Sequence, residues 1–232
     1  MITFRGTALE SVAPVKIVDV LVSPIQMTAT ARQRPVTWGA DFVRMTGGSR
    51  TVSITFALLT QDRGTRQNQL MAITRWARSD APARLTVPDH DGVYLEAICT
   101  ALPEPSLRQW WESKLRITFT TMGNPYWTSI AEKSSACGTA FTVLGDAPPL
   151  MQIRHTFSAS ASNVAYSDGT HTMTFSSISA GNMVIDLNRQ TAAVGTSSIM
   201  SAYAFGGAFI PPATGAQTIT GTGTVYWRER WE

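Results

Sequence analysis

The chain has 232 residues and a mass of 25.2 kDa, with 44% hydrophobic residues and a mean hydropathy of -0.01. This length fits one or two domains, and the 17 glycines, 12 prolines and two cysteines exclude a collagen-like or disulfide-stapled chain. The net charge of +3 is small and no run of five basic residues occurs. Sequence-specific nucleic-acid binding is therefore not expected.

Charged residues are scarce, at 15% of the chain against about 25% in a typical soluble domain. The basic residues are 16 arginines and only three lysines. Arginine and tryptophan are enriched at protein interfaces and lysine is depleted there, because a guanidinium tolerates desolvation and pairs bidentately. The bias indicates either an assembled subunit or the base composition of the genome.

Neither a signal peptide nor a membrane span is expected. The apolar stretch at residues 12–22 is interrupted by Pro14, Lys16 and Asp19, and it falls short of the roughly 18 apolar residues of a span. Cys99 and Cys137 are expected to be free thiols, and Cys99 continues an alternating pattern that would place it in a core. The sequence thus predicts a protein made in the cytosol.

The first half reads as β-strands around one helix. Apolar residues at positions 70, 73, 76 and 77 share one stripe, which predicts a helix over residues 65–78 with Asp62 or Thr65 as its cap. The expected strands are residues 15–22, 51–58, 84–87, 93–100 and 114–121, with a tight turn at 88–92.

Residues 26–50 separate the first two of these strands. The segment is polar and contains turn residues, which predicts a long β-hairpin arm. Its basic and aromatic side chains are candidates for contacts between subunits, because such residues dominate binding energy at interfaces. The candidate interface residues are Arg32, Arg34, Trp38 and Arg44.

Composition changes after residue 128. Residues 129–146 are rich in Ser, Ala and Gly, which predicts a linker between domains at 1–128 and 147–232. The second domain has short alternating segments without a helical period, which is typical of an all-β sandwich. Its expected strands are residues 151–157, 171–175, 182–187, 190–195 and 223–231.

No credible catalytic, cofactor or metal site emerges from the sequence. Asp89, His90 and Asp91 sit on one turn, where adjacent side chains diverge, whereas metal ligands converge from several segments. Nucleophile motifs are missing around the three histidines. A glycosidase would need two convergent carboxylates, and the candidates show no spacing that guarantees them. These are Glu96, Glu104, Glu112 and Asp186.

The order of features along the chain is informative. A strand is followed by a helix ending in Trp76-Ala77, a hairpin with an acidic turn, and a Thr-Phe strand before an Asn-Pro-Tyr turn. These stretches are residues 53–59, 83–97, 115–119 and 123–126, followed by 181–186 and 192–194. Their succession resembles that of the distal tail protein (Dit) family of long-tailed bacteriophages. Trp110 and Trp111 match no feature of the family.

This resemblance implies a mainly β fold, with an N-terminal β-sandwich or split-barrel domain carrying one α-helix and the hairpin arm. The C-terminal domain would be a galectin-like β-sandwich. It further implies a non-enzymatic tail protein of the virion, forming a homohexameric ring between the tail tube protein and the tail-tip hub, with DNA passing through the channel unread.

A carbohydrate-binding module for host attachment is the alternative. In that interpretation, the C-terminal sandwich is lectin-like, and exposed aromatic rings stack on sugars. The candidate aromatic residues are Trp110, Trp111 and Tyr203. A six-subunit mass without glycan binding would favour the ring, and glycan binding by a monomer would favour the module.

Overall fold

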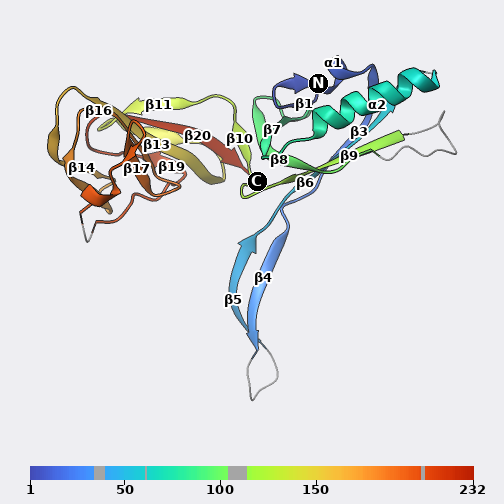
Figure 1. The fold of residues 1–232 in the computed structure, drawn as a ribbon. Coiled ribbons are helices and arrows are strands. Elements are labelled where there is room, and N and C mark those ends of the chain that lie inside the picture. The colour runs from blue at the N-terminus through green and yellow to red at the C-terminus, as the bar shows by residue number, and fades with distance from the viewer. Residues whose placement is uncertain (34–39, 61, 104–113, 205–206) are drawn as a thin grey trace. The chain divides into compact units, whose positions relative to one another are not determined.

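The computed structural model describes residues 1–33, 40–60, 62–103, 114–204 and 207–232 (Figure 1). In strands β4 (Met27–Gln33) and β5 (Ala40–Gly47), only the backbone is described. The chain forms two compact units, Met1–Trp127 together with Glu232, and Thr128–Trp231. The short strand β10 (Trp127–Ser129) lies at the division. The fold is mainly β, as the sequence predicts.

An antiparallel sheet organises the first unit, because alternating residues give each strand one apolar face. Helix α2 (Arg63–Ala77) packs Trp76 against Phe4 and Phe119 of this sheet, and the short helix α1 is Leu9–Val12. In order across the sheet, the strands are β2 (Thr7–Ala8), β1 (Thr3–Phe4), β7 (Ala83–Thr86), β8 (Val93–Ala101), β9 (Lys114–Thr121), β6 (Thr51–Leu58) and β3 (Val15–Val22).

The second unit is built from strands whose inward side chains form one apolar core, with Tyr166 and Phe175 fully buried. One sheet has the order β18 (Ser197–Ser198), β17 (Thr191–Val194), β16 (Gly181–Asp186), β13 (Ala147–Phe157), β20 (Thr224–Trp231) and β11 (Lys133–Ala136). Opposite it lie the pairs β14 (Ala161–Ser167) with β15 (Thr172–Ile178), and β12 (Phe141–Val143) with β19 (Gly215–Gln217).

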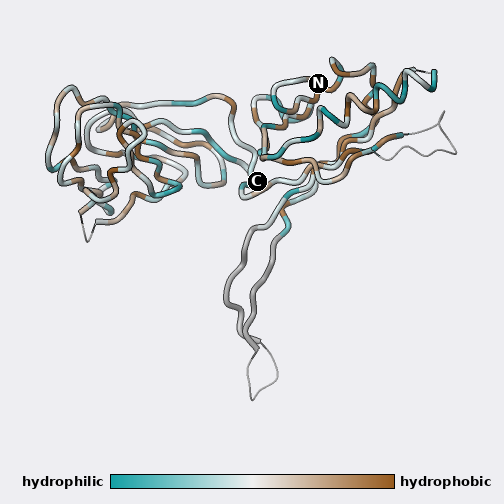
Figure 2. Tube along the Cα trace, in the orientation of Figure 1, coloured by the Kyte–Doolittle hydropathy of each residue, from teal (hydrophilic) through white to brown (hydrophobic). Residues whose placement is uncertain are grey.

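Two bridges, Ser167 to Thr220 and Phe175 to Tyr203, tie the β14–β15 pair to later chain segments. A single turn of 3-10 helix, Met200–Ala202, completes the unit. Figure 2 shows hydrophobic residues spread along the strands of both units, as buried alternating faces require. None of the helices in the described ranges is long and apolar enough to span a membrane.

The linker expected at residues 129–146 is wrong. This stretch contains β11, which pairs with β20, and β12, where Phe141 and Val143 are buried. The Phe141 ring stacks on Trp227 with centroids 4.6 Å apart. Serine and glycine dominate the composition, but the two apolar side chains of a three-residue strand suffice to join the core.

Helix α2 begins two residues earlier than expected because Asp62 caps it. The Asp62 carboxylate accepts a hydrogen bond from the Thr65 amide at 2.7 Å, and this bond lowers the pKa of Asp62 below its usual 3.8. A lowered folded pKa means that the carboxylate stabilises the fold above the unfolded pKa, and that this contribution is lost as the pH falls through the folded pKa.

We therefore expect Asp62→Ala to lower the thermal midpoint at neutral pH and to have a smaller effect in strong acid. Asp62→Asn keeps a capping oxygen without a charge. Its thermal midpoint should therefore fall less than that of Asp62→Ala at neutral pH, by only the contribution that depends on the carboxylate charge. Thermal unfolding of the three proteins across this pH range checks the prediction. An equal effect of Asp62→Ala at both ends of the range would contradict it.

Candidate assembly surfaces

The arm expected at residues 26–50 is a β-hairpin. Strands β4 and β5 pair from Met27 opposite Gly47 to Gln33 opposite Ala40, and they form a separate two-stranded sheet that continues from β3 and β6 (Figure 1). The backbones of Arg32 and Arg44 lie in this ribbon, opposite Asp41 and Thr30. Arg34 and Trp38 lie outside the described residues. The role of these four side chains at an interface stays a prediction.

The arm leaves the sheet through a hydrogen-bonded neck. The Ser23 amide donates to Thr51 O at 2.8 Å, and the Thr51 amide donates to Ser23 Oγ at 2.8 Å. Farther out, the Gly48 amide donates to Gln26 O at 2.7 Å. A side chain at position 48 would start 2.7 Å from that same oxygen, so the glycine permits the close approach. The two ends of the arm are thus held together independently of its tip.

Arg50 ties this neck to the rest of the sheet. Its side chain is buried, with 5% exposed, and its guanidinium lies 5.8 Å from the centroid of the Trp127 ring. The Arg50 amide donates to Thr121 Oγ1 at 2.8 Å, and the Thr121 amide donates back to Arg50 O at 2.9 Å. The Trp127 ring also stacks with His90, whose ring centroid is 4.1 Å away.

Several arginines of the first unit serve contacts within it. Arg116 donates to Ser53 Oγ at 2.7 Å, and Arg84 lies 4.6 Å from the centroid of the Tyr94 ring. Arg5 donates to the main-chain oxygen of Arg78 at 3.1 Å. These arginines therefore make contacts within the first unit itself, so the arginine excess is not reserved for contacts between subunits.

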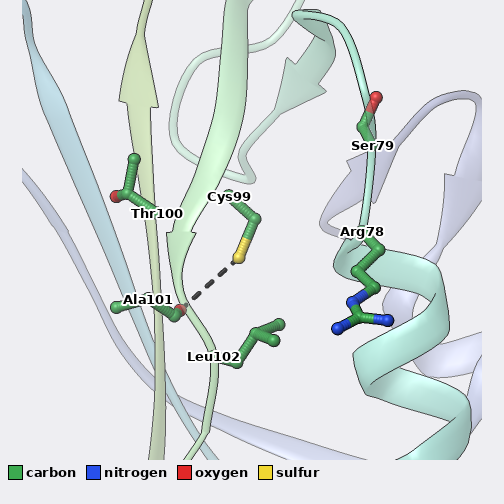
Figure 3. Close-up of a pocket in the computed structure, with 6 residues that line it drawn as sticks. All are labelled: Arg78, Ser79, Cys99, Thr100, Ala101 and Leu102. Atoms are coloured by element: carbon green, nitrogen blue, oxygen red, sulfur yellow. Dashed lines mark hydrogen bonds between the residues drawn. The ribbon is translucent and has the colours of Figure 1, made fainter.

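A groove runs between α2 and the end of β8, and we call it the basic groove. Its walls include Met71, Arg75 and Arg78 on the helix side and Cys99, Leu102 and Pro103 on the other side. Figure 3 shows Arg78 extending into the space that the Cys99 thiol and Leu102 face. The part around Cys99 encloses about 460 Å³ and the part around Met71 about 370 Å³.

Cys99 is only half-buried, so its expected place in the core is wrong. The register of β8 against β9 shifts between Cys99 and Ala101, which breaks the alternation that the earlier residues follow. The Cys99 thiol donates to Ala101 O at 3.5 Å, and burial raises its pKa. The thiol therefore lies at the wall of the basic groove in its protonated form.

The acidic turn, residues 88–92, joins β7 to β8. Its Asp89 and Asp91 are exposed, whereas His90 between them stacks on Trp127. The described part of the chain holds no group of three His, Cys, Asp or Glu side chains that could bind a metal ion. Of the carboxylates considered for hydrolysis, Glu104 and Glu112 lie outside the described residues, and Glu96 and Asp186 belong to different units.

Two features of the second unit bear on carbohydrate binding. The Tyr203 ring stacks on Phe209 with centroids 5.0 Å apart and forms an edge contact with Phe175 at 5.6 Å, so packing within the unit already covers part of the ring that would stack on a sugar. On the neighbouring strands β13 and β20, Arg154 forms two hydrogen bonds of 3.0 Å with Glu132 and lies 4.3 Å from the Tyr226 ring centroid. These contacts occupy the polar and aromatic side chains that a sugar would otherwise use there. Trp110 and Trp111 lie outside the described residues.

Sequence reasoning missed the basic groove. Its walls come from segments about twenty residues apart, and only the fold brings them together. One signal was readable: residues 63–78 contain four arginines and no acidic residue, which is unusual for an exposed helix with a polar face.

Comparison with solved structures places this architecture. The crystal structure of SPP1 Dit (gp 19.1), described as a paradigm of the hub adsorption apparatus in phages infecting Gram-positive bacteria, matches with a TM-score of 0.76. The match covers 100% of this chain and 98% of that one at 13% identity. The chain has the fold of a phage distal tail protein.

Chains of the phage P2 baseplate in its activated conformation also match. The form with Ca covers 96% of this chain and 92% of the other at 8% identity, with a TM-score of 0.44. The form with Sr covers 94% and 91% at 9% identity, with a TM-score of 0.42. No protein-family model and no curated protein sequence matches this chain.

Proposed function

We propose that this protein is a structural, non-enzymatic subunit of a phage tail tip. It forms a homohexameric ring that joins the tail tube protein to the tail-tip hub, and DNA passes through the channel. The observation that carries the proposal is the distal-tail fold, which matches over 100% of this chain and 98% of SPP1 Dit. The chain would act in the virion after assembly in the host cytoplasm.

The features of the first unit fit a ring subunit. A cyclic ring uses heterologous contacts, so each protomer needs two different complementary surfaces. The hairpin arm, held at its neck by Ser23, Gln26 and Arg50, offers one such surface with Arg32, Arg34, Trp38 and Arg44 as its contact residues. A pre-formed neck lowers the entropy that the arm would lose on binding.

The mass of the purified protein under native conditions tests the proposal. A ring gives a species near six times 25.2 kDa in light scattering or native mass spectrometry, and six-fold rings in electron microscopy. A monomer at every concentration would contradict ring formation. A glycan array run on the same sample separates the lectin-like alternative, which requires binding by the monomer.

A further inference from the structure

We propose that the basic groove of one protomer receives the acidic turn of its neighbour. The inference rests on the proposed ring and names one pair of complementary surfaces, besides the hairpin arm, for the contact between neighbouring subunits. The occupant is a second copy of this chain, and the contact joins Arg75 and Arg78 to Asp89 and Asp91.

The groove carries positive charge that the protomer does not neutralise. Arg75 and Arg78 are exposed, and within the described ranges neither guanidinium has a hydrogen-bond or ion-pair partner. Helix α2 contains no acidic residue, and the nearby Asp80 forms no ion pair with either arginine. Two guanidinium charges outweigh the half-unit negative charge of a helix C-terminus. The site therefore favours an anion.

Apolar side chains line the same groove. Met71 is 52% exposed, which is high for so large an apolar side chain, and Leu102 and Pro103 lie on the opposite wall. A partner that covers this surface removes apolar area from water and strengthens the nearby charge pairs by excluding solvent. The groove suits a short protruding turn that carries carboxylates.

The acidic turn has this form. Asp89 and Asp91 are exposed, and no ion pair or hydrogen bond of their side chains occurs among the residues that the structure describes. The turn itself is fixed: the His90 ring stacks on Trp127, the His90 amide donates to Val87 O at 3.3 Å, and Gly92 takes a φ of 77°. A fixed turn loses little entropy on docking.

The two surfaces cannot pair within one protomer. They lie at opposite ends of β8 (Val93–Ala101), and the eight residue steps from Asp91 to Cys99 cover up to about 26 Å at ~3.3 Å per step. A pair of surfaces at opposite ends of one strand is the heterologous arrangement that propagates around a ring. Arg75 lies in the last turn of α2 and Arg78 is the residue that follows the helix as its C-cap. Both line the same part of the groove, so two carboxylates of one turn can engage both.

Charge reversal tests the contact. We compare the wild-type chain with Arg75→Glu/Arg78→Glu, with Asp89→Arg/Asp91→Arg, and with the four changes combined. Each double variant should raise the protomer concentration at which half the protein is assembled by about tenfold or more, since reversing the charges turns attraction between the two surfaces into repulsion. The quadruple variant restores opposite charges and should reassemble. Arg63→Glu is the matched control, because Arg63 lies on α2 away from the groove.

A second readout uses Cys99 as a probe. In a Cys137→Ser background, Cys99 should react with a maleimide more slowly in the ring than in the Asp89→Arg/Asp91→Arg variant at a concentration where that variant is unassembled, because the turn of the neighbour covers the thiol in the ring. Far-UV circular dichroism and melting curves of every variant show whether the protomers are folded.

The outcomes separate the two proposals. A wild-type monomer overturns both the ring and this contact. A ring that survives both double variants overturns the contact alone. Folded double variants that dissociate without rescue in the quadruple variant also overturn the pairing. A double variant that forms rings of normal mass but no longer binds an acidic protein of the tail would assign the groove to that protein. This outcome would contradict a second copy as the occupant.

Discussion

Replacing residues 27–47 by a short Gly-Ser connection should convert the proposed ring to monomers of about one sixth of its mass. The neck allows this deletion, because the Gly48 amide already donates to Gln26 O at 2.7 Å. A few flexible residues can therefore close the gap without strain. The pairing of β3 with β6 and the Arg50 contacts to Thr121 stay in place, so the protomer should keep its thermal midpoint.

A large effect is expected because an arm that packs only on a neighbour adds no stability to the protomer, whereas it stabilises the proposed ring. Within the described backbone, β4 and β5 form a two-stranded sheet of their own, and an isolated two-stranded hairpin is marginally stable in water. A partner that covers it would supply the missing burial. Light scattering of the deletion variant beside the full chain measures the change.

Point variants in the intact arm locate the contact. Alanine at Arg32, Arg34, Trp38 and Arg44 together should weaken assembly nearly as much as the deletion, because arginine and tryptophan carry most of the binding energy at interfaces. The control variant carries alanine at Thr28 and Thr30, which lie on strand β4 together with Arg32. An unchanged oligomer mass after deletion would show that the arm is a solvated loop and that the ring uses other surfaces.

The long strands of the first unit follow directly from the sequence. The predicted strands at 15–22, 51–58 and 114–121 match β3, β6 and β9 residue for residue. Each of them is rich in β-branched or aromatic residues and has one face less exposed than the other, so local propensity and tertiary burial agree. The helix differs only at its ends, where capping by Asp62 decides the first turn.

Several strands were not predictable from the sequence, for a physical reason. Strand β14, with its serines and asparagine, has no apolar alternation, yet Tyr166 near its end is fully buried. Strands of two to four residues such as β1 and β11 are too short to show a period. Their pairing is decided by partners far away in the chain, and a single sequence does not reveal these partners.

Of the two candidate surfaces, the arm was predictable from the sequence and the basic groove was not. The arm is a contiguous segment whose polar, turn-rich composition is visible in the sequence. The basic groove depends on a register shift at Cys99 and on the packing of α2 beside the end of β8. Asp89 and Asp91 were visible as an acidic turn, but their exposure follows from the stack of His90 on Trp127, which the spacing along the chain does not indicate.

Phe119→Ala should destabilise the first unit by about 3–5 kcal/mol, the range for truncating a buried phenylalanine. The Phe119 side chain has 0% exposure, and its ring centroid lies 4.9 Å from Phe4 and 6.0 Å from Trp76. One ring thus joins β9, β1 and α2, and its removal leaves a cavity that none of the three elements can fill alone.

This loss approaches the whole stability of a small domain, about 5–15 kcal/mol, so the thermal midpoint of the first unit should fall by roughly 10–20 °C. Met122→Ala is the matched control: Met122 directly follows β9 and is 45% exposed, so its replacement should change the free energy of unfolding by less than about 0.5 kcal/mol. Calorimetry of both variants decides the matter. A loss below about 1 kcal/mol for Phe119→Ala would contradict the prediction and would mean that α2 and the sheet repack around the missing ring. Phe119→Leu, which refills part of the cavity, should then have the same free energy of unfolding as Phe119→Ala.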